Sequence, residues 1–77
     1  MAEEFFAKIP KDTMKRINGY VAQGSACGLA SGKEAWCDRI TTACSVLYDC
    51  GFLSFAERVL ASAHFRSRVY GVEEVAR

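Results

Sequence analysis

The chain has 77 residues, of which 51% are hydrophobic and 25% charged, and its formal net charge is +1. This length predicts one small domain, residues 1–77, and argues against a multistep enzyme. The near-neutral charge argues against nucleic-acid binding, because proteins that contact phosphates usually carry a basic excess. No apolar run approaches the about 20 residues that span a bilayer. The acidic start at Glu3 and Glu4 predicts no signal peptide. We therefore expect a cytoplasmic protein without a membrane partner.

Two helices are predicted in the first third of the chain. Before Pro10, apolar side chains recur at helical spacing, which indicates a short amphipathic helix that ends at the proline. We expect the next helix to begin at an N-cap residue, Asp12, to run to about Gln23 and to stop at Gly24. Its apolar stripe consists of Met14, Ile17 and Val21.

The segment from Gly24 to Gly32 has a glycine at every fourth position. A loop is the default prediction, because each glycine costs a helix about 1 kcal/mol. The alternative is that small residues four apart let two helices approach closely. Lys33 does not complete a phosphate-binding loop, because the glycine spacing is one residue short and Glu34 stands where that motif needs a hydroxyl.

The third predicted helix runs from Gly32 to Cys50 and opens with a capping box, in which Ser31 is followed three residues later by Glu34. One face of this helix is apolar and the opposite face is an almost uninterrupted polar stripe. We expect the apolar face to lie in the core. Its residues are Trp36, Cys37, Ile40, Ala43, Cys44, Leu47 and Tyr48.

The fourth predicted helix runs from Phe55 to Tyr70, opens with a capping box of Ser54 and Glu57 and ends before Gly71. Its predicted core face consists of Phe55, Ala56, Val59, Leu60, Ala63 and Tyr70. The last residues, Val72 to Arg77, predict a frayed turn or a short helical tail. Together these elements predict an all-α fold, a compact small bundle of three main helices plus a short N-terminal helix.

The four cysteines indicate buried thiols. Cys27, Cys37, Cys44 and Cys50 include no C-x-x-C pair, whereas structural zinc sites usually draw their ligands from close pairs. Two disulfides would fit a secreted protein. Because free cysteine often serves as a small core residue, we expect reduced thiols, no metal and no cofactor.

No catalytic constellation is present in the sequence. His64 is the single histidine, and its helical phase places it at the edge of the fourth helix, so no catalytic residue is predicted. The short junction from Gly51 to Leu53 is compatible with a helix-turn-helix motif. The helix that follows is poor in base-reading amides, which argues against DNA recognition.

The outer face of the fourth helix is the candidate binding site. Phe65 and Val69 point away from the predicted core face, and Arg58, Arg66 and Arg68 surround them. An aromatic and an aliphatic side chain rimmed by arginines have the composition of an interface centre and would suit an acidic partner surface. The alternative is that the N-terminal helix or the tail covers Phe65 and Val69.

These patterns favour a small non-enzymatic protein-binding module, most simply a stoichiometric inhibitor of a larger protein or complex. Such small proteins without enzyme motifs are typical of phage and mobile-element inhibitors, including anti-CRISPR proteins. Antitoxins, adaptors and subunits of larger assemblies have the same profile. A helix-turn-helix DNA-binding regulator and a thiol- or metal-binding protein are the alternatives. No small-molecule ligand is expected.

Overall fold

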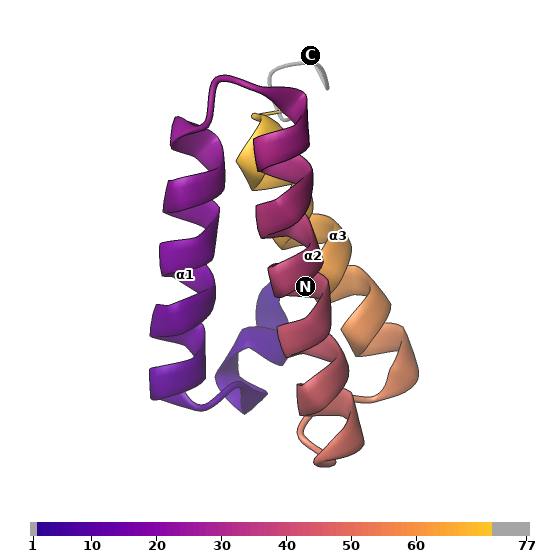
Figure 1. The fold of residues 1–77 in the computed structure, drawn as a ribbon. Helices are drawn as coiled ribbons and strands as arrows, with labels where there is room; N and C mark the ends of the chain where they lie inside the picture. Colours follow the sequence, from indigo (N-terminus) through magenta and orange to yellow (C-terminus); the bar gives the residue numbers. More distant parts are fainter. Residues whose placement is uncertain (1, 72–77) are drawn as a thin grey trace.

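The computed structural model describes residues 2–71, and the predicted tail at Val72 to Arg77 lies outside them. The chain begins with a 3-10 helix, η1 (Ala2–Lys8), and continues with α1 (Lys11–Ala26), α2 (Ala30–Asp49) and α3 (Phe55–Tyr70). Helices α1 and α2 run side by side in opposite directions, α3 packs against both, and η1 lies near the end of the bundle where α1 begins (Figure 1). The predicted all-α bundle of three main helices is confirmed.

Helix α1 continues through Gly24, where the sequence predicted its end, and stops at Ala26. Gly24 is buried, and a Cβ atom at this position would lie 2.9 Å from Cγ1 of Val69 and 3.1 Å from Cβ of Trp36. The absence of a side chain therefore lets α1 approach α3 closely. The close helix contact is confined to Gly24, because a Cβ atom at Gly28 would meet nothing within 4 Å. The predicted loop is present but shorter than expected, since only residues 27–29 lie between α1 and α2.

The helix starts differ from the predicted ones in α1 and α2. Helix α1 begins directly after Pro10, which is its N-cap residue, so Asp12 lies inside the first turn. Helix α2 begins after Leu29, which makes no side-chain capping hydrogen bond. The predicted capping box of Ser31 and Glu34 is wrong, because both residues already belong to the helix.

Helix α3 has the predicted bounds and both predicted caps. The backbone N–H of Glu57 donates to Oγ of Ser54 at 3.1 Å, and the backbone N–H of Ser54 donates to Oε1 of Glu57 at 2.9 Å. At the other end Gly71 has a φ of 68°, the left-handed conformation that glycine adopts most easily. Both ends of α3 are therefore encoded locally.

One hydrophobic core is shared by all three helices, η1 and the turns. The predicted stripes of α1 and α2 supply much of it, although Trp36 is only half-buried and Tyr48 is exposed. The buried residues of the core are Phe5, Ile9, Ile17, Val21, Cys37, Ile40, Cys44, Leu47, Leu53, Ala61, Phe65 and Val69.

The predicted core face of α3 is wrong. Val59 and Leu60, which were assigned to the core, are 47% and 51% exposed, whereas Phe65 is 1% exposed. Helix α3 carries apolar residues on two sides, so its own sequence does not select the buried side. The neighbouring elements select it: Phe6 of η1 stacks on Phe65 with ring centroids 5.5 Å apart, and Gly24 leaves room for Val69.

Candidate protein-binding surfaces

The predicted site residues do not form one surface. Phe65 and Val69 are buried at 1% and 2% exposure, so the prediction that they face a partner is wrong. The alternative that the N-terminal helix covers Phe65 holds, since the Phe6 ring lies on it. Arg66 and Arg68 are exposed and Arg58 is half-buried, so only the arginines of the predicted site reach solvent.

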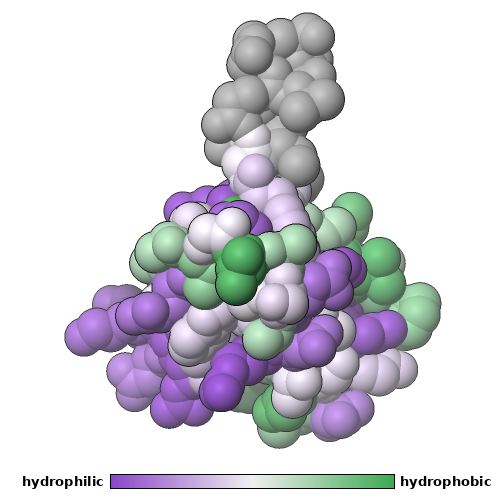
Figure 2. Space-filling view, turned by 45° about the horizontal axis from the view of Figure 1, so that its top comes forward, coloured by the Kyte–Doolittle hydropathy of each residue, from purple (hydrophilic) through white to green (hydrophobic). Residues whose placement is uncertain are grey.

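The side of α3 that faces solvent is apolar. We call it the α3 apolar face; it consists of Phe55, Ala56, Val59, Leu60 and Ala63, all of them exposed. Phe55 is 60% exposed, the largest value among the aromatic side chains that the structure describes. Hydrophobic side chains gather at the right-hand edge of the space-filling view, on the side where α3 lies in Figure 1, with hydrophilic residues between them (Figure 2). The sequence had assigned this face to the core.

Arg58 joins the α3 apolar face to α2. Its guanidinium lies over the Phe55 ring at 4.8 Å and over the Tyr48 ring at 5.7 Å, and its Nη1 donates to Oγ of Ser45 at 3.5 Å. The two rings themselves meet edge to face with centroids 6.0 Å apart. These contacts hold Phe55 in place although most of its surface is exposed.

The charged side chains of α3 itself are mostly basic. Arg58, Arg66 and Arg68 belong to α3, whose one acidic residue is Glu57. The carboxylate of Glu57 accepts from Nζ of Lys8 at 2.6 Å. This hydrogen bond and the one from the Ser54 backbone lower the pKa of Glu57 from its ordinary value. Because its one carboxylate is already paired, α3 presents arginines to an incoming partner.

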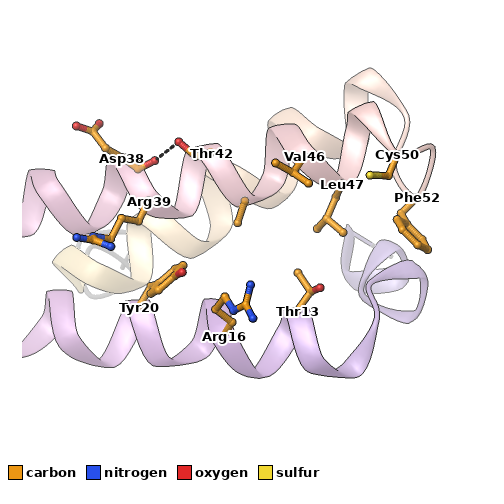
Figure 3. Close-up of a pocket in the computed structure, with 11 residues that line it drawn as sticks. Thr13, Arg16, Tyr20, Asp38, Arg39, Thr42, Val46, Leu47, Cys50 and Phe52 are labelled. Carbon is orange, nitrogen blue, oxygen red and sulfur yellow. Dashed lines mark hydrogen bonds between the residues drawn. The ribbon is translucent and has the colours of Figure 1, made fainter.

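A groove of about 570 Å³ lies between α1 and α2 and is closed at one end by the turn that follows α2. We call it the α1–α2 groove (Figure 3). Its floor and one end are apolar, and its walls carry hydroxyl and charged groups. The lining residues are Thr13, Arg16, Tyr20, Asp38, Arg39, Thr42, Ala43, Val46, Leu47, Cys50 and Phe52.

Two arginines stand on opposite walls of the α1–α2 groove. Arg16 comes from α1, and Arg39 comes from α2, where its guanidinium lies 5.0 Å from the centre of the Trp36 ring. Asp38 directs its carboxylate away from the groove, while its backbone carbonyl accepts from Oγ1 of Thr42 at 2.9 Å (Figure 3). Sequence reasoning missed this groove, because no motif connects the three segments that line it.

The four thiols are free and differ in burial. Cys37 and Cys44 are buried, as predicted, whereas Cys27 is half-buried and Cys50 is exposed at the end of the α1–α2 groove. Burial raises the pKa of Cys44 to about 11, an effect that the charge of Arg58 partly offsets. Within residues 2–71, no group of three or more His, Cys, Asp or Glu side chains is placed to hold a metal ion.

His64 is half-buried and packs among aromatic side chains, whereas the sequence predicted a position at the edge of the fourth helix. Its ring contacts the Phe6 ring and the Phe65 ring at centroid distances of 5.0 Å and 5.3 Å. His64 therefore contributes to the contact between η1 and α3.

The fold and its surfaces define a small three-helix bundle with an exposed apolar helix face and an open groove. No protein-family model matches the chain, and no curated protein or solved structure shows significant similarity to it. In the described part of the chain, no helix has the length and apolar character needed to cross a membrane.

Proposed function

We propose that the chain is a small non-enzymatic protein-binding module that docks through the α3 apolar face and acts as a stoichiometric inhibitor of a larger protein. The observation that carries this proposal is the exposure of Phe55, Val59 and Leu60, at 60%, 47% and 51%, on one side of one helix. Contiguous apolar surface of this kind is often a site of protein contact. The small size of the chain favours action by covering a partner's surface.

The residue composition of the face supports a protein partner. Phe55 is held by Arg58 and Tyr48, so little side-chain freedom is lost when a partner covers it. Aromatic residues and arginine are enriched among the residues that dominate binding energy. A partner that covers these half-exposed side chains removes apolar surface from water, and each Å² removed contributes about 25 cal/mol of favourable free energy.

The charge of α3 supports an acidic partner. Arg66 and Arg68 are exposed on the same helix, and each guanidinium can donate two parallel hydrogen bonds to a carboxylate. Two copies of the chain that paired through this face would bring arginines toward arginines, which is unfavourable. Charge therefore favours an acidic partner over a second copy.

The proposal is tested by Leu60→Glu, which places a negative charge within the α3 apolar face. Its matched control is Ala22→Glu, which adds the same charge at an exposed position of α1. The wild-type chain and the Ala22→Glu variant should retain one larger protein from host extract in a fixed stoichiometry. The Leu60→Glu variant should lose that protein while its melting temperature stays unchanged.

Two results would contradict the proposal. One is retention of the same protein by the Leu60→Glu variant at the wild-type stoichiometry. The other is a large loss of melting temperature in that variant, because Leu60 would then belong to the core. Reconstitution of the captured protein with the purified chain measures inhibition directly, since a binding module without an inhibitory role would leave the partner's activity unchanged.

A further inference from the structure

We propose that the α1–α2 groove is a second binding site and that it takes an acidic amphipathic helix of a partner protein. The groove is separate from the α3 apolar face, because none of its lining residues belongs to α3. Val46 and Phe52 line it and yet are 52% and 46% exposed, so part of its apolar lining faces solvent. The inference is independent of the role proposed for α3.

The dimensions of the groove suit a helix. Between Arg39 and Cys50 it follows α2 for roughly 17 Å, at 1.5 Å per residue, and its volume is about 570 Å³. It is open to solvent, whereas small-molecule sites usually enclose most of the ligand surface. An amphipathic helix needs to bury only one side, so an open groove accommodates it.

The antiparallel pair of α1 and α2 provides the packing surface for such a helix. Helix α3 already packs against this pair elsewhere, and an added helix in the groove would complete a four-helix arrangement (Figure 1). Leucine or phenylalanine side chains three and four positions apart would contact Val46, Leu47 and Phe52 at the apolar end.

The charges on the walls select an acidic helix. Arg16 and Arg39 stand on opposite walls and form no ion pair with another residue whose side chain the structure describes. The carboxylate of Asp38 points away from the groove (Figure 3). An occupant with carboxylates on both flanks of its apolar stripe would therefore meet one arginine on each side, and charge-assisted hydrogen bonds would fix its orientation.

Two side chains native to the protein can report on binding in the groove. Trp36 is the only tryptophan of the chain, and its ring lies 5.8 Å from that of Tyr20, a groove residue. Cys50 is exposed at the apolar end, whereas Cys37 and Cys44 are buried. Tryptophan fluorescence therefore reports on one end of the groove, and the rate of Cys50 alkylation by iodoacetamide reports on the other.

The test uses two synthetic helical peptides of about four turns with the same leucines three and four positions apart, long enough to follow the roughly 17 Å groove. One peptide carries glutamates beside the leucines and the other carries lysines. The acidic peptide should change Trp36 fluorescence saturably, slow Cys50 alkylation at least about fivefold and bind more weakly at high salt. The basic peptide should do none of these.

Charge reversal in the protein provides the second arm. The double variant Arg16→Glu/Arg39→Glu should lose protection of Cys50 by the acidic peptide and gain it from the basic peptide. Both positions are exposed, so the fold should be retained. Leu60→Glu should leave the groove response to the acidic peptide intact, which separates a failure of this inference from a failure of the α3 proposal.

Several outcomes would overturn the inference. They are equal binding of both peptides, binding of neither, or unchanged protection in the double variant. Protection of Cys50 by dodecanoate but not by the acidic peptide would assign the groove to a small amphipathic anion instead. Protection that rises with protein concentration in the absence of peptide would assign it to a second copy of the chain.

Discussion

Phe65 lies on the side of α3 that the rest of the molecule buries. Its side chain is among the largest that are fully buried, and the rings of Phe6 and His64 pack on it. Leu60 lies on another side of the same helix and is 51% exposed. Two apolar residues five positions apart therefore have opposite roles, one in the core and one on the surface.

We predict that Phe65→Ala lowers the free energy of unfolding by about 3–5 kcal/mol, because it removes buried surface and leaves a cavity. Against a total of about 4–12 kcal/mol for a chain of this size, that loss would unfold a large share of the molecules. Leu60→Ala should cost about 1 kcal/mol or less. Urea denaturation measures both, and the reverse order would mean that α3 is rotated.

Gly24 and Gly19 give a matched pair within α1. A Cβ atom at Gly24 would meet Val69 at 2.9 Å, whereas a Cβ atom at Gly19 would meet nothing within 4 Å. Gly24→Ala should therefore destabilise the protein by about 1–3 kcal/mol through overpacking. Gly19→Ala should stabilise it by about 0.5–1 kcal/mol through higher helix propensity. Thermal unfolding of the two variants separates the effects; equal stabilisation would show that α1 and α3 are less closely packed.

At the scale of elements, the helix starts differ in how well they are capped. The capping box of α3 satisfies backbone donors at its first turn, and Glu57 of that box also holds Lys8 of η1 at 2.6 Å. Helix α2 has Leu29 at its N-cap position with no side-chain hydrogen bond, and this leucine is 73% exposed. The start of α3 is therefore capped by side-chain hydrogen bonds, whereas the start of α2 is not.

We predict opposite effects of substitution at the two caps. Ser54→Ala should lower the free energy of unfolding by about 1 kcal/mol, the usual value of a lost N-cap. Leu29→Asp should raise it by up to about 1 kcal/mol, since the backbone of Leu29 already has the extended conformation of a capping residue. Urea midpoints provide the comparison. A decrease with Leu29→Asp would show that this leucine contributes packing that its exposure does not indicate.

At the scale of the whole molecule, folding is linked to pH through Cys44. This thiol has an ordinary pKa of 9.0, and burial raises its pKa to about 11 in the folded protein. Between these values the folded state holds a proton that the unfolded chain has released. The contribution of Cys44 to stability is therefore complete below about pH 9 and falls as the pH rises toward 11.

We predict that this loss reaches on the order of 2–3 kcal/mol by pH 11, at about 1.4 kcal/mol per pH unit. Cys44→Ala should flatten the dependence above pH 9, whatever its effect at neutral pH. Cys50→Ala, at an exposed thiol, is the control and should keep the wild-type slope. Denaturation midpoints between pH 7 and pH 11 give the test, and identical slopes in the two variants would contradict it.

The sequence by itself determined the elements of this protein. Helix α3 has the predicted bounds because Ser54, Glu57 and Gly71 act within a few residues of where they stand. The stripes of α1 and α2 were predictable because each helix has one dominant apolar side, with Ile17 and Ile40 fully buried at its centre. Local hydrogen bonding and helical periodicity both act within one segment, so one segment suffices to predict them.

Only the tertiary structure decided which side of α3 is buried and where the binding surfaces lie. Val59 and Phe65 give α3 two apolar sides, and the choice between them depends on the Phe6 ring and on the missing side chain of Gly24, both from other elements. The α1–α2 groove had no sequence signal, because its arginines come from separate helices. A surface formed where helices pack together depends on the distances between separate segments. The periodicity of one segment carries no information about those distances.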